Sequence, residues 1–97
     1  MPSMRTSRSV DSVKVRVSYF ARVRQFAGTR EDEFTIARPA CVRQLLSEVV
    51  SAHPGLVNIK EKLSLIVNGL EGGVSALEDT ELKDGDEVVF LIPVGGG

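Results

Sequence analysis

One segment combines an apolar stripe with helical spacing over more than two turns, and it limits the folds open to this chain. The stripe consists of Val42, Leu45, Leu46, Val49 and Val50, at positions i, i+3, i+4, i+7 and i+8. Pro39 is expected to stop the preceding strand and open this helix, and His53-Pro54-Gly55 to end it. A lone amphipathic helix must bury its stripe against another element, and strand patterns flank it on both sides.

The strand patterns begin at Val13–Phe20, where apolar and polar residues alternate. Phe20 is an anomaly, because it is an aromatic residue on the otherwise polar face. A short helix should follow over Ala21–Ala27 and end at Gly28. Glu33–Ala37 is then predicted as an antiparallel neighbour of the first strand. The residues expected to share the buried face of the first strand are Val13, Val15, Val17 and Tyr19.

Two further strands are predicted after the main helix. Leu63–Val67 should be a strand closed by the turn dipeptide Asn68-Gly69, after an irregular passage. Glu71–Gly73 is interpreted as a loose turn and Val74–Leu77 as a brief edge strand. Glu87–Ile92 is apolar after Glu87, which is typical of a central strand. The predicted order is therefore ββαβ(β)β, an α+β fold with a four- to five-stranded sheet on one main helix.

The last strand also predicts a partner surface. If Val88, Phe90 and Ile92 point inward, Val89 and Leu91 emerge on the outer face of the sheet. Together with Phe20 they would form an exposed apolar patch, and such patches usually mark an interface. The opposite register, with Val89 and Leu91 inside, stays open at this point.

Composition bounds the remaining possibilities. The 97 residues carry 12 basic and 13 acidic side chains, so the formal net charge of −1 gives no reason to expect nucleic acid or a membrane as partner. The lone Cys41 cannot form an internal disulfide, which favours a reducing compartment, the cytoplasm. One Cys and one His, His53, do not make a zinc site. We expect residues 1–12 to be a disordered extension, residues 13–92 one domain and residues 93–97 a flexible tail.

The tail is Pro93-Val94-Gly95-Gly96-Gly97, and it follows the last predicted strand directly. Without side chains, such an end can thread a narrow channel and present its carboxylate to another protein's active site. Fully extended, it would reach roughly 17 Å from the domain. A nonspecific flexible end is the alternative interpretation.

Three stretches resemble the MoaD family, the small subunits of molybdopterin synthase within the ubiquitin-like β-grasp sulfur carriers. The first, residues 17–28 (VSYFARVRQFAG), is similar to that family's opening strand and short helix. The second, residues 82–88 (LKDGDEV), is similar to its final turn, and the third, residues 93–97 (PVGGG), to its ending. Thiamine-pathway carriers typically lack the helix after the first strand, so Ala21–Gly28 argues against them.

The resemblance implies a function for the tail. A MoeB-like adenylating enzyme would use ATP to activate the carboxylate of Gly97, and sulfur would then replace AMP to give a thiocarboxylate. Gly96 would accompany Gly97 in this role, with Gly95, Val94 and Pro93 as the tether. A MoaE-like large subunit would receive the sulfur. No cofactor is expected on the chain itself.

The resemblance also places partner contacts on the outer face of the sheet near the tail, which matches the patch of Phe20, Val89 and Leu91 inferred from the strand pattern. Arg24 flanks this region and could pair with an acidic partner residue, but a solvated side chain is the favoured interpretation, since exposed ion pairs contribute little. The alternative function is a ubiquitin-like modifier joined through Gly97 to lysines, because both functions share the activation step. The sequence does not distinguish these two outcomes.

Overall fold

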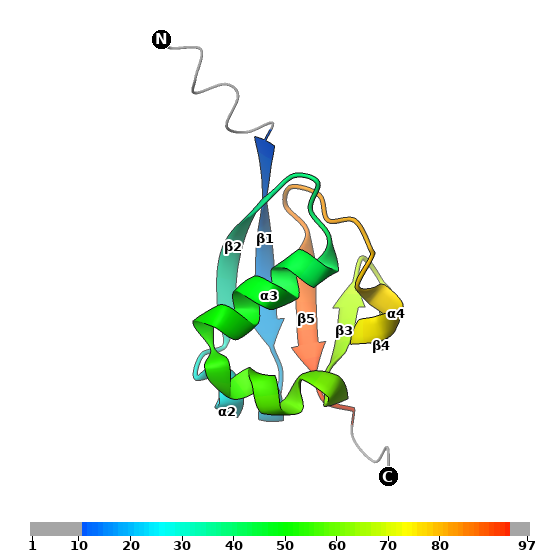
Figure 1. The fold of residues 1–97 in the computed structure, drawn as a ribbon. Coiled ribbons are helices and arrows are strands. Elements are labelled where there is room, and N and C mark those ends of the chain that lie inside the picture. Colours follow the sequence, from blue (N-terminus) through cyan, green and yellow to red (C-terminus); the bar gives the residue numbers. More distant parts are fainter. Residues whose placement is uncertain (1–10, 94–97) are drawn as a thin grey trace.

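The computed structural model describes residues 11–93, which form a five-stranded mixed sheet (Figure 1). The strand order is β2-β1-β5-β3-β4. Strands β1 and β5 run parallel, and the other neighbouring pairs are antiparallel. The predicted strands at both ends of the domain and the antiparallel pairing of the first two are confirmed. The strands are β1 (Ser12–Tyr19), β2 (Glu31–Ala37), β3 (Ser64–Val67), β4 (Leu70–Gly73) and β5 (Glu87–Leu91).

The main helix α3 lies across one face of this sheet (Figure 1). Its apolar stripe faces the sheet as predicted: four of its residues are buried, and Val50 is half-buried at the rim. The short helix after the first strand is also confirmed, and Gly28 ends it with φ +79°, a conformation that favours glycine. The helices are α2 (Arg22–Ala27), α3 (Val42–Ala52), the 3₁₀ helix η1 (Pro54–Lys62) and α4 (Val74–Leu77).

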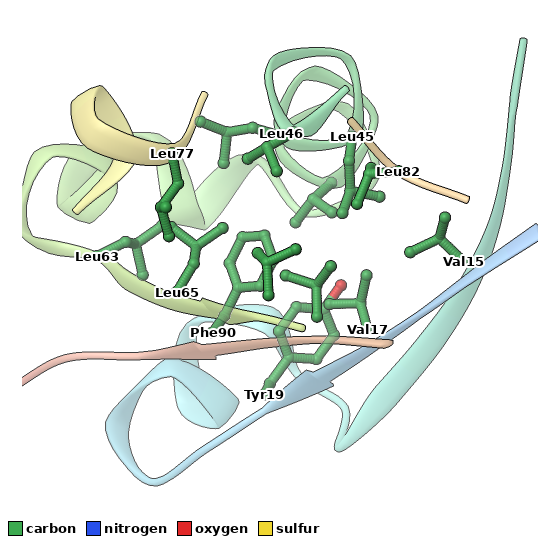
Figure 2. Close-up of a cluster of buried hydrophobic side chains, with 14 of the residues drawn as sticks. Val15, Val17, Tyr19, Leu45, Leu46, Leu63, Leu65, Leu77, Leu82 and Phe90 are labelled. Atoms are coloured by element: carbon green, nitrogen blue, oxygen red, sulfur yellow. The ribbon is translucent and has the colours of Figure 1, made fainter. Parts of the chain in front are cut away.

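The core lies between the sheet and α3. Figure 2 shows side chains from β1, β3 and β5 directed toward Leu45 and Leu46 of the helix. Phe90 and Leu45 are fully buried, as are all the apolar residues predicted on the inner face of β1. Truncating a fully buried leucine such as Leu45 to alanine costs about 2–5 kcal/mol in proteins generally, so this contact holds the two layers together.

The predictions for the region after β3 were wrong in part. Glu71–Gly73, interpreted as a loose turn, belongs to β4, and Val74–Leu77, expected as an edge strand, is the helix α4. The reason is the two-residue turn at Asn68-Gly69, where both residues have positive φ. Such a turn pairs the residues directly before and after it, so the returning strand must begin at Leu70. The passage expected to be irregular is also regular, because η1 begins at Pro54.

The boundaries of the main helix also differ from the prediction at its beginning. Pro39 follows the end of β2, as expected, but α3 begins only at Val42. Cys41 is the N-cap, and its backbone N–H donates to the side-chain Oε1 of Gln44 at 2.9 Å. An N–H that lacks an intrahelical partner is thereby satisfied.

Strand β5 lies in the centre of the sheet, between β1 and β3, as its apolar pattern predicted. Val88 and Phe90 are fully buried, and Ile92 packs partly against the core. Val89 and Leu91 therefore belong to the outer face, where both are half-buried. The inward register proposed first for this strand is confirmed, and the opposite register is wrong.

The expected extension and tail lie almost entirely outside the described residues. The strand β1 begins at Ser12, one position before the predicted domain boundary. Among residues 11–93, no helix is both long enough and apolar enough to cross a membrane.

Candidate functional site

The candidate site begins where β5 ends. The strand stops at Leu91, Ile92 still contacts the core, and Pro93 is exposed. The roles predicted for Val94, Gly95, Gly96 and Gly97 concern positions outside the described residues and stay predictions. The structure does fix the base of the tail: Pro93 comes shortly after β5, the central strand, which is paired with β1 on one side and β3 on the other.

The outer face beside this exit carries an apolar surface. Val89 is paired with Ser18 of β1 on one side and with Ile66 of β3 on the other. Ile66 and Leu91 are half-buried on the same face, since they alternate with the buried residues of their strands. We call Phe20, Ile66, Val89 and Leu91 the outer patch. Sequence reasoning missed Ile66, because the apolar run Leu63–Val67 does not show which residues face outward.

Phe20 is the most exposed member of the outer patch. Its side chain follows the buried Tyr19, and the residue retains 51% of its accessible surface. The backbone N–H of Phe20 donates to the carbonyl oxygen of Phe90 at 3.0 Å, which keeps it beside the end of β5. The structure thus brings together Phe20, Val89 and Leu91, three of the predicted contact residues, at the base of the tail.

Arg24, the fourth predicted contact residue, lies on α2 at the border of this surface. Its Nε donates to the backbone carbonyl of Tyr19 at 3.3 Å, so part of the guanidinium group is bound to the domain. Phe20, Arg24, Arg30 and Glu31 help to line a surface hollow of about 350 Å³. A partner that docks on Phe20 would therefore meet a charged border of two arginines and one glutamate, to which its own charges must be complementary.

A polar cluster lies beneath the start of this surface, and sequence reasoning did not find it. The hydroxyl of Tyr19 donates to Oδ2 of Asp32 at 2.9 Å. The same oxygen lies 2.5 Å from Nε2 of His53, and the Tyr19 and His53 rings meet edge to face with centroids 5.5 Å apart. The sequence predicted that His53 ends the main helix. Its backbone N–H donates to the carbonyl of Val49 at 2.9 Å, as is typical of a helix end, and its ring binds Asp32.

Tyr19 stays a neutral donor in this cluster. Burial raises the pKa of Tyr19 well above the ordinary value of 10, and the adjacent carboxylate of Asp32 raises it further. The phenol is therefore protonated at neutral pH. Its hydroxyl donates to Asp32, so this polar group is hydrogen-bonded although the side chain is buried.

This raised pKa predicts an alkaline loss of stability. A group whose pKa is higher in the folded than in the unfolded state contributes stability that is fully present below its unfolded-state pKa. This stability is lost as the pH rises from the unfolded-state pKa through the folded-state pKa. The free energy of unfolding should thus fall above a pH near 10, by up to about 1.4 kcal/mol per pH unit. Urea unfolding of the wild type and Tyr19→Phe across this range measures the effect, because the variant has no tyrosine left to ionise. Identical slopes in the two proteins would contradict it.

The described residues contain no group of three or more His, Cys, Asp or Glu side chains arranged to hold a metal ion. Cys41 is half-buried at the start of α3, whereas the single histidine of the sequence, His53, binds Asp32 at the other end of the helix. The thiol therefore has a structural position, and the outer patch with the tail is the candidate site.

Known proteins are similar to this chain over most of its length. A family model described as the ThiS family matches residues 17–97. The molybdopterin synthase sulfur carrier subunit of Chlamydomonas reinhardtii is 33% identical over 85 residues, which cover 88% of this chain and 100% of the relative.

Solved structures share the fold. A protein assigned as subunit 1 of molybdopterin converting factor from Pyrococcus furiosus superposes with a TM-score of 0.73 and 37% identity, over 86% of this chain and 100% of the other. Small archaeal modifier protein 1 of Methanosarcina acetivorans superposes with a TM-score of 0.73 and 26% identity, over 89% of this chain and 98% of the other. A chain from the complex of subunits 1 and 2 of molybdopterin-converting factor from Helicobacter pylori superposes with a TM-score of 0.59 and 25% identity, over 88% of this chain and 100% of the other.

Proposed function

The chain belongs to the ThiS family, and we propose that it is the sulfur carrier subunit of molybdopterin synthase in molybdenum cofactor biosynthesis. The observation that carries the proposal is the attachment of a glycine-rich end to the central strand of a fold shared with sulfur carriers. The helix α2, between β1 and β2, also separates this chain from the pattern of thiamine-pathway carriers.

The chemistry resides at the carboxyl group of Gly97. A carboxylate is a poor electrophile, so a partner adenylating enzyme of the MoeB type joins it to the α-phosphorus of ATP and releases pyrophosphate. The terminal sulfur of a persulfide donor then attacks the acyl carbon, and AMP leaves with the electron pair of the broken C–O bond, which gives an acyl disulfide. A thiol next attacks the donor's sulfur of this disulfide and forms a new disulfide with the donor. The sulfur on the acyl carbon keeps the electron pair of the broken S–S bond. The product is a thiocarboxylate on Gly97, with Gly96 as the adjoining unbranched residue. The chain needs no bound cofactor for these steps, because ATP belongs to the partner.

The second partner is the large subunit of the synthase, of the MoaE type. The H. pylori relative occurs in a complex of subunits 1 and 2, which supports such an assembly. We propose that the large subunit docks on the outer patch while the tail enters its active site. The patch suits this role because a small apolar centre with one prominent aromatic residue is typical of an interface hot spot.

A free Cys41 fits the reducing compartment proposed for these steps, the cytoplasm.

A protein modifier is the alternative function. Its support is the likeness to small archaeal modifier protein 1, at 26% identity. The C. reinhardtii sulfur carrier, at 33% identity over nearly its whole length, favours the carrier function instead. The modifier function is therefore the less favoured of the two.

Intact mass spectrometry of the protein purified from its native host tests the proposal. The expected result is a population heavier by the replacement of one oxygen with sulfur, located on Gly97 by fragmentation. Branched peptides with Gly97 on lysine, in the absence of that population, would favour the modifier. If neither product forms and removal of Gly96 and Gly97 leaves molybdopterin synthesis intact, the carrier function is wrong.

A further inference from the structure

The chain makes a strained turn immediately after Phe20. Ala21 has φ +52° and ψ −122°, and the N–H of Val23 donates to the carbonyl of Phe20 at 3.0 Å. These angles belong to the first central position of a type II′ turn, which glycine normally occupies. A residue with a Cβ persists there only where its surroundings determine the backbone conformation.

The residue before Phe20 supplies one half of that constraint. Tyr19 has no exposed surface, and its hydroxyl is bound by the carboxylate of Asp32, which also contacts His53. Its ring meets the ring of Phe90 as well, with centroids 5.9 Å apart. The backbone N–H of Tyr19 donates to the carbonyl of Arg30 at 2.8 Å. The orientation of Tyr19 is thus fixed from β2, β5 and the end of α3 at once.

The helix after the turn supplies the other half. The backbone N–H of Arg24 donates to the carbonyl of Ala21 at 3.1 Å, and its Nε donates to the carbonyl of Tyr19 at 3.3 Å. The carbonyl of Tyr19 therefore accepts a hydrogen bond from α2, while its hydroxyl donates to Asp32 of β2 and its ring contacts His53 at the end of α3. The exposed Phe20 lies between these two attachments.

From this geometry we propose that Tyr19, hydrogen-bonded to Asp32 and in ring contact with His53, is a positioning residue that acts with the strained turn at Ala21 to hold Phe20 in its docking orientation. Successive residues of a strand point to opposite faces, so fixing Tyr19 inward fixes Phe20 outward. A side chain oriented before docking loses less freedom on binding, which increases affinity. The inference rests on the proposed docking of the large subunit at the outer patch.

Two substitutions test this role, with the large subunit of molybdopterin synthase from the same organism as the probe in calorimetry. Tyr19→Phe removes only the hydroxyl, and Ala21→Gly relieves the strained conformation without touching the cluster. Each should weaken binding by about fivefold, the effect of ordering one further side chain. Ala21→Gly should meanwhile keep or raise the urea midpoint, so affinity and stability move in opposite directions. The double variant should lose less than the product of the two single losses, because both free the same side chain.

Val13→Ala is the matched control. Val13 is 1% exposed and lies at the far end of β1, so this change lowers the urea midpoint without reaching the turn. Its affinity for the large subunit should equal that of the wild type. If Tyr19→Phe and Ala21→Gly bind as tightly as the wild type, or Val13→Ala weakens binding as much as they do, the positioning role is wrong.

Phe20→Ala separates this inference from the docking proposal. If Phe20→Ala weakens binding but Tyr19→Phe and Ala21→Gly do not, only the positioning role fails. If Phe20→Ala binds like the wild type, docking through Phe20 fails and the positioning role with it. The thiocarboxylate on Gly97, measured separately by mass, reports on the carrier function in either case.

Discussion

Adding one tryptophan after Gly97 is expected to abolish thiocarboxylate formation and leave the free energy of unfolding unchanged. The proposed acyl carbon is that of Gly97, and the extension converts its carboxylate into an amide that cannot be adenylated. The new terminus carries a bulky side chain and lies one residue further along. A misplacement of about 1 Å at the reacting atoms can lower a rate 100-fold, so we expect the rate of thiocarboxylate formation to fall by at least about 100-fold. Incubation with the adenylating enzyme, ATP, a persulfide donor and a reducing thiol, followed by intact mass, measures the rate.

The matched control adds one glycine instead of tryptophan. It lengthens the tail equally but brings no Cβ, so it separates the effect of length from that of the side chain. Both extensions lie beyond Pro93, which is already exposed, so neither should disturb the core. Both proteins should therefore unfold in urea like the wild type. A tryptophan-extended protein that still receives sulfur at the wild-type rate would show that the unbranched end is not the reactive group.

The elements that were predicted correctly from sequence are those whose signals are local. The alternation of Val13–Phe20 and the stripe of the main helix each record burial on one face, and both faces are as expected. Gly28 was placed at the end of α2 for a local reason too, because its positive φ suits a residue without Cβ. Patterns of this kind depend on the residue's own element and not on distant contacts.

The elements that were predicted wrongly depend on distant contacts. A segment of four residues such as Val74–Leu77 carries too little periodicity to distinguish a helix from a strand. Its form is decided by the register of the β3–β4 hairpin and by packing, since Leu77 is buried and lies against Gly72. The outward direction of Ile66 similarly follows from its pairing with Val89 across two strands.

The cluster of Tyr19, Asp32 and His53 could not be predicted for the same reason. Its members come from β1, β2 and the end of α3, and they meet only after the sheet has paired and the helix has packed. The alternation of β1 placed Tyr19 inside, which was correct. Buried polar groups are nearly always hydrogen-bonded, so the buried hydroxyl of Tyr19 requires an acceptor. A tyrosine that is predicted to point inward therefore implies a polar partner from another element, and the sequence contains this much of the signal.

Replacing Phe20 with aspartate is expected to weaken binding of the large subunit by about 100-fold, because aromatic hot-spot residues contribute roughly 2–4 kcal/mol. The domain should stay folded, since Phe20 is 51% exposed and contributes little to the core. The new carboxylate would also be buried on docking within an apolar centre, which adds a desolvation cost. Titration calorimetry gives the affinity, and circular dichroism with urea unfolding checks the fold.

Leu70→Asp is the matched control for this prediction. Leu70 is 57% exposed, so its replacement removes an exposed apolar side chain much as that of Phe20 does. Leu70 pairs with the inward-facing Val67, however, and therefore lies on the side of the sheet opposite to the outer patch. Its affinity should stay near that of the wild type. Phe90→Ala, in contrast, should destabilise the domain by about 3–5 kcal/mol, because Phe90 is fully buried. Equal loss of binding in Phe20→Asp and Leu70→Asp would mean that the partner does not dock specifically on the outer patch. Unfolding of Phe20→Asp would show instead that Phe20 supports the core. The exposure of Phe20 beside the buried Tyr19 and Phe90 makes the separation of docking from stability the expected outcome.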